Sequence, residues 1–118
     1  MSGLPSSLPG IDVAEGLARI GGNVTLYVKL LRKIANDTPA IRDRLSAAIV
    51  EGDAVGAKEA AHSLKGAASN LSIVTLTEAA AQLEAAAGQE DFSAMFSLLD
   101  ALDKAIDDYV QAIEGLNV

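Results

Sequence analysis

The chain has no cysteine and no tryptophan, and it has a single histidine among its 118 residues. Without cysteine, disulfide bonds and thiolate metal sites are excluded, which fits a cytoplasmic protein. Charged residues interrupt the apolar stretches well before the ~18 apolar residues that a membrane-spanning helix requires. The first ten residues, MSGLPSSLPG, lack the basic and apolar regions of a signal peptide. We therefore expect a cytoplasmic location.

Positive charge is scarce as well. The chain has 9 lysine and arginine residues against 16 aspartate and glutamate residues, which gives a net charge of -7. Binding to nucleic acid or to an acidic membrane requires clustered basic side chains that neutralise phosphate groups. We expect no general affinity for either partner, so any anion-binding site in this chain must be local.

Aromatic residues are also few, at 3%, although 50% of the residues are hydrophobic. Alanine and leucine supply most of the difference, and such a mixture favours closely packed helices. A chain of this length suits one domain, which can bury a core without disulfides or metal. We predict a single helical domain over residues 10–118, preceded by a flexible lead-in or linker over residues 1–9.

Apolar residues recur at intervals of three and four along most of the chain, which indicates amphipathic helices. A short helix is expected over residues 12–20, with Asp12 as its N-terminal cap. A second helix begins after a cap at Asn23 and is expected to break between Asn36 and Pro39. A further helix should then extend from about Pro39 to Val50.

The second half of the chain shows the same periodicity. A cap at Asp53 predicts a helix over about residues 54–70, and Thr75 or Thr77 is expected to cap the next helix, which ends at a glycine. The last helix should run over about residues 91–113. No stretch alternates convincingly as a β-strand. The pattern predicts an all-α fold, an antiparallel four-helix bundle with a short additional N-terminal helix.

The segment AHSLKGAASN, residues 61–70, places a glycine inside a predicted helix, where glycine costs roughly 1 kcal/mol relative to alanine. At about 100° per residue, one side of this helix carries five residues: His62, Lys58, Lys65, Gly66 and Ser69. The opposite side is apolar and is expected to face the core: Ala60, Leu64, Ala67 and Leu71. Gly66 therefore lies beside the histidine, where a missing side chain leaves room for another macromolecule.

His62 is a poor metal ligand. It has lysine neighbours, which would repel a cation, and the motif has no nearby acid, so too few ligands converge. It is equally poor as the base of a catalytic triad, since it orients no nucleophile. It is well placed to carry a phosphoryl group, which Lys65 and Lys58 would stabilise. Three alternatives stay open from composition alone: a solvated histidine, solubilising lysines, and a glycine that packs against another helix.

The sequence HSLKGAA, residues 62–68, resembles the H-x-L-K-G motif of histidine phosphotransfer (HPt) domains. LPGIDVAEGLARIGGN, residues 8–23, is similar to the opening of HPt domains at the C-terminus of hybrid sensor kinases. LTEAAAQLEAAA, residues 76–87, resembles the helix that follows the motif. The similarity covers nearly the whole chain from Leu8. The three segments together are far more specific to the family than H-x-x-K-G alone.

The resemblance implies a four-helix bundle whose exposed histidine takes a phosphoryl group from an aspartyl phosphate on a receiver domain and passes it to another receiver. His62 would be the phosphorylated residue, Lys65 the lysine that steadies the phosphoryl group, and Gly66 the clearance residue. Lys58 and Ser69 are expected to join Gly66 in binding the partner. The chain would be a carrier and not an enzyme, with Mg²⁺ and catalysis supplied by the receiver and no cofactor or metal of its own.

The implied partners are receiver domains of a hybrid sensor kinase or a response regulator, and the chain is expected to be a monomer. It would be free in the cytoplasm or form the cytoplasmic end of a membrane-bound sensor kinase. A histidine kinase fragment is disfavoured because the chain has no glycine-rich nucleotide site and is too short for an ATP-binding domain. A helical interaction module that docks a receiver without carrying phosphate is the alternative.

The chain departs from the family pattern near the motif. Relatives often have glycine where this chain has Ser72, and glycine or another small residue where it has Ser69. The helix end and the docking surface are therefore expected to differ slightly. Glu84 stands where an amide side chain often reaches toward the histidine. A carboxylate there would raise the basicity of the histidine but repel its phosphoryl group, so Glu84 is assigned no firm role.

Overall fold

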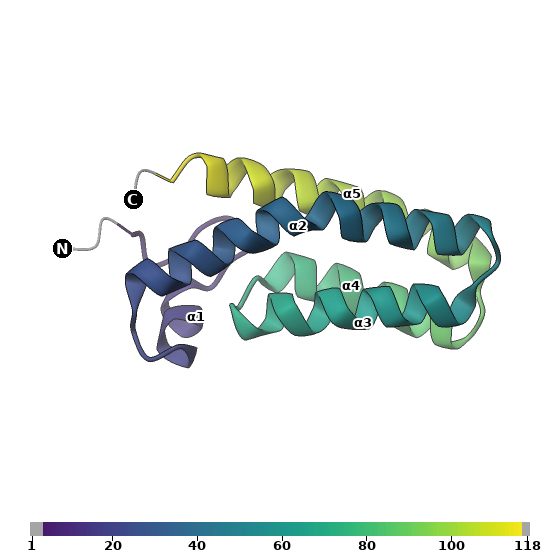
Figure 1. The fold of residues 1–118 in the computed structure, drawn as a ribbon, viewed down its shortest axis with the longest axis horizontal. Coiled ribbons are helices and arrows are strands. Elements are labelled where there is room, and N and C mark those ends of the chain that lie inside the picture. The colour runs from purple at the N-terminus through teal and green to yellow at the C-terminus, as the bar shows by residue number, and fades with distance from the viewer. Residues whose placement is uncertain (1–3, 117–118) are drawn as a thin grey trace.

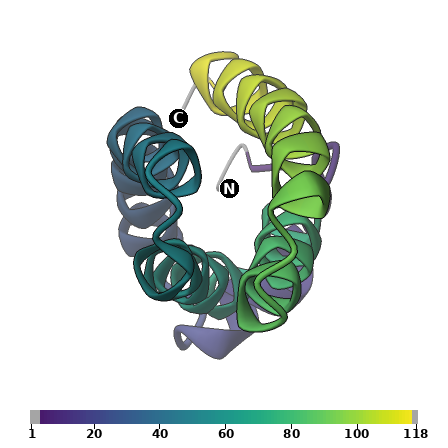
Figure 2. The ribbon, with the colours of Figure 1, turned by 90° about the vertical axis from the view of Figure 1, so that its right-hand side faces the viewer.

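The computed structural model describes residues 4–116, which form five α-helices: α1 (Val13–Arg19), α2 (Val24–Val50), α3 (Ala54–Asn70), α4 (Val74–Gly88) and α5 (Phe92–Glu114). The four longer helices run antiparallel in sequence order around a common core (Figure 1 and Figure 2). α3 packs between α2 and α4, and α5 packs against α4 and α2. The predicted all-α bundle with a short N-terminal helix is confirmed. No helix among these residues is long and apolar enough to cross a membrane.

Four of the helices begin at a side chain that accepts a hydrogen bond from the backbone N–H three residues later: Asp12, Asn23, Asp53 and Asp91. Such caps satisfy backbone donors that have no partner within the helix. The prediction that Thr75 or Thr77 caps α4 is wrong. α4 begins directly after Ile73, without a side-chain cap, and the Thr77 hydroxyl instead donates to the Ile73 carbonyl at 2.8 Å.

The predicted break between Asn36 and Pro39 is also wrong, because α2 continues through Pro39 as one helix of 27 residues. Proline lacks the N–H that would bond to the carbonyl four residues earlier, which here belongs to Ala35. The Thr38 hydroxyl donates to that same carbonyl at 3.0 Å, and the Thr38 side chain is fully buried. The threonine thus supplies the hydrogen bond that the proline cannot make, and the helix continues.

Two buried tyrosines tie α2 to the rest of the bundle. The Tyr27 hydroxyl donates to the Leu71 carbonyl at 2.6 Å, and the Tyr109 hydroxyl donates to the Leu31 carbonyl at 2.6 Å. Burial raises the pKa of both phenols, that of Tyr27 to about 12, so both remain neutral donors. Gly16 of α1 lies so close to the Tyr27 hydroxyl and the Leu71 carbonyl that a Cβ atom would collide with both. A glycine is therefore required where α1 meets the bundle.

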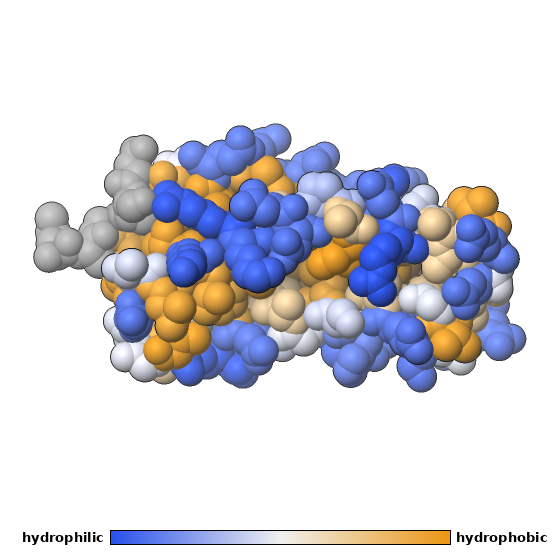
Figure 3. Space-filling model, viewed as in Figure 1, coloured by the Kyte–Doolittle hydropathy of each residue, from blue (hydrophilic) through white to orange (hydrophobic). Residues whose placement is uncertain are grey.

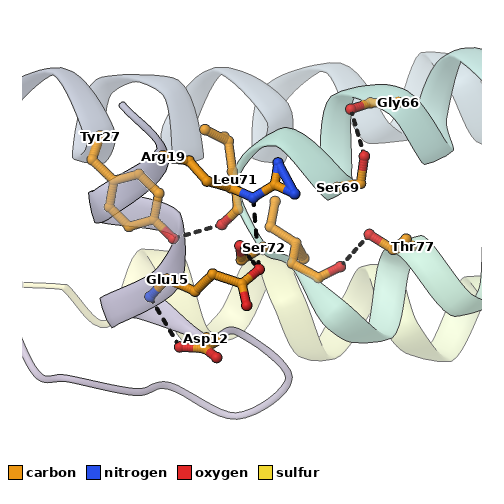
Figure 4. Close-up of polar contacts among 10 residues, drawn as sticks. Asp12, Glu15, Arg19, Tyr27, Gly66, Ser69, Leu71, Ser72 and Thr77 are labelled. Carbon is orange, nitrogen blue, oxygen red and sulfur yellow. Dashed lines mark hydrogen bonds and ion pairs between the residues drawn. The ribbon is translucent and has the colours of Figure 1, made fainter. Parts of the chain in front are cut away.

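Polar contacts around Ser72 attach α1 to the connection between α3 and α4 (Figure 4). Ser72 has a φ of 57°, in the left-handed region that glycine adopts most easily. The Ser72 hydroxyl donates to Glu15 Oε1 at 2.8 Å, and the Asp12 N–H donates to the Ser72 carbonyl at 2.9 Å. The serine strains the turn but adds a hydrogen bond to α1.

The segment before α1 lies against the domain from Leu4 onward. Leu4 and Leu8 pack against the core, and the Leu8 and Ile11 backbones exchange two hydrogen bonds. Ile11 also forms an isolated β-bridge with Ile73 at the start of α4. Leu4 and Leu8 of the predicted lead-in thus contact the bundle, and residues 1–3 lie outside the described residues.

Candidate functional site

His62 lies in the middle of α3 with 68% of its side chain exposed. The core-facing side of α3 is made of buried small or leucine side chains: Ala57, Ala60, Ala61, Leu64 and Ala68. The predicted apolar side is wrong for Ala67, which is exposed. Ala61 and Ala68, which the prediction omitted, show that the buried side is turned toward the Lys65 side of the helix. The solvent-facing position predicted for His62 is correct.

A carboxylate from α4 holds the His62 side chain. Glu84 Oε2 lies 2.6 Å from His62 Nδ1, and the Lys65 ammonium donates to Glu84 Oε1 at 2.5 Å. Glu84 is the least exposed of the three side chains, at 17%. The hydrogen bond from Lys65, and secondarily that from His62, lowers the pKa of Glu84 against the opposing effect of desolvation. Glu84 is therefore an ionised bridge between two residues of the motif.

This bridge determines which nitrogen of His62 is free to react. An ionised carboxylate can only accept hydrogen bonds, so the proton of a neutral imidazole must reside on Nδ1. The other nitrogen, Nε2, then carries the lone pair. Because Nε2 lies on the far edge of the ring from Glu84 and the side chain is largely exposed, the lone pair is open to an approaching electrophile.

Gly66 has open space around it. A Cβ atom added at Gly66 would meet no other atom within 4 Å, apart from its own helix backbone and chain neighbours. The helix-packing alternative for Gly66 is therefore wrong. Ser69 is half-buried, and its hydroxyl donates to the Gly66 carbonyl at 3.2 Å (Figure 4). These two residues form a smooth continuation of the His62 side of α3.

An open groove of about 870 Å³ runs beside His62 between three helices. It is lined by residues of α2, α3 and α4: Arg44, Val55, Lys58, Glu59, His62, Ser63 and Glu84. The surface over α2 and α3 mixes hydrophilic and hydrophobic side chains (Figure 3). Lys58 thus lies where the sequence placed it, near His62. Arg44 and Glu84 reach the site from other helices. The resemblance places Glu84 opposite the histidine, whereas nothing in the sequence marks Arg44.

The composition of the site does not resemble a metal centre. Among residues 4–116, no three side chains of histidine, cysteine, aspartate or glutamate lie close enough together to hold a metal ion. Glu84, the one carboxylate bonded to His62 within the described part of the chain, is already paired with the Lys65 ammonium. The arrangement instead presents a single nucleophilic nitrogen with a carboxylate behind it.

The model of the Hpt domain family matches residues 29–114, which include this entire site. The chain belongs to the Hpt domain family. Hpt domains function in histidine phosphotransfer within the phosphorelays of two-component systems and interact with receiver domains. They are phosphocarriers rather than catalysts.

The fold of a solved Hpt domain agrees with this assignment. The chain is similar to the crystal structure of the HPT domain from the Hpt sensor hybrid histidine kinase from Shewanella, with a TM-score of 0.73 and 18% identity. The match covers 95% of this chain and 100% of the other. No curated protein sequence matches the chain significantly. The structural likeness supports the helical bundle, and the family match supports histidine phosphotransfer.

Two glycines of this Hpt domain should respond oppositely to the same substitution. Gly66→Ala should be neutral or should stabilise the fold by up to ~1 kcal/mol, because the methyl group meets nothing and alanine favours the helix. Gly16→Ala should destabilise it by roughly 1 to 3 kcal/mol, because the methyl group collides with Tyr27 and Leu71. Urea unfolding of both variants measures the difference, and a destabilised Gly66→Ala variant would contradict the open position of Gly66.

Proposed function

We propose that this Hpt domain accepts a phosphoryl group on Nε2 of His62 from the aspartyl phosphate of a receiver domain and passes it to another receiver. The observation that carries the proposal is the contact between Glu84 and Nδ1, which leaves the exposed Nε2 as the reactive nitrogen. The exposure of His62 and the open space at Gly66 support it, since the donor is itself a folded domain.

In the proposed step, the Nε2 lone pair attacks the phosphorus atom while the bond between phosphorus and the aspartate oxygen breaks, and the aspartate leaves as a carboxylate. The receiver, with its Mg²⁺, supplies catalysis. Attack by Nε2 makes the imidazole ring formally cationic, because Nδ1 keeps its proton. The Glu84 carboxylate, 2.6 Å from Nδ1, stabilises that charge. Transfer to the second receiver is the reverse of this step.

Lys65 acts through Glu84 in this proposal. Its ammonium is bonded to Glu84 Oε1, on the Nδ1 side of His62, and direct contact with a phosphoryl group on Nε2 would require it to leave Glu84. By pairing with Glu84, Lys65 keeps the carboxylate ionised and aimed at the ring. Lys65 thus stabilises the phosphorylated site by positioning its neighbour.

The docking surface that we propose extends along the exposed side of α3. Gly66 provides clearance for the receiver, and Lys58 and Ser69 flank His62 on either side along the helix. We further propose that the domain acts as a monomer in the cytoplasm, free or as the cytoplasmic end of a sensor kinase. The competing function is a module that docks a receiver without carrying phosphate, and it would survive the loss of His62.

His62→Gln should fold normally, because the side chain is 68% exposed, but it should take up no phosphoryl group. The measurement is acid-labile label on the chain after incubation with receivers charged by acetyl phosphate. Lys29→Gln, an exposed change on α2 outside the groove, is the control and should label like the wild-type chain. Equal uptake by His62→Gln, on any residue, would remove the proposal.

Lys65→Ala should slow phosphoryl transfer by roughly two- to fivefold, the range of a partly exposed charge pair, and therefore less than the loss of His62. Its matched control is Lys104→Ala, which removes a lysine paired with Asp108 on the far helix α5. Single-turnover transfer in both directions measures the effect. If Lys65→Ala and Lys104→Ala transferred equally fast, the pair with Glu84 would have no part in the reaction.

A further inference from the structure

Most cationic side chains of this domain are already engaged. Six of the 9 lysine and arginine residues have an interaction partner: Arg19, Arg32, Lys33, Arg42, Lys65 and Lys104. The other three make no hydrogen bond or ion pair with any described residue: Lys29, Arg44 and Lys58. Two of these three, Arg44 and Lys58, line the groove beside His62. The free positive charge of the domain is thus concentrated where its nucleophile lies.

The hydrogen bonds of Glu84 keep the Lys65 ammonium at the Nδ1 side of His62. α3 lies between α2 and α4 (Figure 2), with Arg44 on α2 and Glu84 on α4. Glu84 holds Nδ1 and the Lys65 ammonium together, so both lie on one edge of the ring. A phosphoryl group on Nε2 extends from the other edge, away from this bonded pair.

The balance of charge in the groove favours a dianion beside Arg44 and Lys58. The negative charge of Glu84 is offset by Lys65, which leaves Glu59 as the one unpaired carboxylate among the groove residues. Against it stand two unpaired cations, one of them a guanidinium, whose planar fork suits the oxygens of a phosphoryl group. Arg44 comes from the regular helix α2, which packs against α3.

We propose that Arg44, together with Lys58, binds the phosphoryl group on His62, and that Lys65 does not touch it. Arg44 then stabilises the phosphorylated state by direct contact, from α2 and not from the motif helix. The inference rests on the proposed function in one respect, that the phosphoryl group is carried on Nε2. It assigns to two helices the charge stabilisation that the family resemblance places on a single lysine.

Phosphoramidate provides a test that needs no receiver. Its N–P bond breaks as the bond to Nε2 forms, and the departing nitrogen takes up a proton and leaves as ammonia. The pH at which the phosphoryl group of the intact chain loses its last proton is then read by ³¹P NMR. Neighbouring cations favour the dianion, so Arg44→Gln and Lys58→Gln should each raise this midpoint by roughly 0.2 to 0.7 pH units, as expected for exposed charge pairs.

The control variants should shift the midpoint in directions that can also be predicted. Lys29→Gln removes an unpaired cation of α2 outside the groove and should leave the midpoint unchanged, whereas Glu59→Gln should lower it. Lys65→Gln should shift it less than Arg44→Gln. A wild-type midpoint in both Arg44→Gln and Lys58→Gln, or a larger shift in Lys65→Gln, would overturn the proposal. Failure of the proposed function would give a different result. Phosphorylated receivers would then transfer no phosphoryl group to the chain, although the shifts of the midpoint would still be seen.

Discussion

The close packing of α3 against α4 is the constraint on which the site depends. The buried side chains of these two helices include seven alanines: Ala57, Ala60, Ala61, Ala68, Ala80, Ala86 and Ala87. Because alanine adds only a methyl group to a helix surface, the two backbones approach closely enough for one glutamate to reach two side chains of the neighbouring helix. Glu84 thereby contacts His62 and Lys65 at once. A larger side chain in this seam would separate the helices and remove both contacts.

The contact with Glu84 also fixes the orientation of His62 while leaving its side chain exposed to solvent. An exposed imidazole has little packing to fix its orientation, and Glu84, which is far less exposed, provides a fixed partner. Because the pKa of Glu84 is lowered, the carboxylate is ionised at neutral pH, and its stabilising contribution is lost only as the pH falls through that lowered pKa. One edge of the ring is thus held by the domain, and the other edge is left for the partner.

Much of the fold and part of the site could be predicted from the sequence because their signals are local. Helical spacing alone places His62 and Gly66 on one exposed side of α3. The prediction of a break at Pro39 is wrong because the Thr38 hydroxyl replaces the missing backbone hydrogen bond, and it can do so only once the helix has formed. The resemblance placed Glu84 opposite His62, but the role of Glu84 could not be predicted. It lies 22 residues from His62, and their contact depends on the register of two packed helices, which periodicity does not determine.

Glu84 should hold His62 with Nδ1 protonated and Nε2 free. The domain has a single histidine, so a long-range ¹H–¹⁵N correlation spectrum of its ring at mildly alkaline pH reports this directly. We predict that Nδ1 carries the proton and that Nε2 shows the chemical shift of an unprotonated nitrogen, with a mixture of the two forms in Glu84→Ala. A wild-type spectrum in which Nε2 carries the proton would contradict the account.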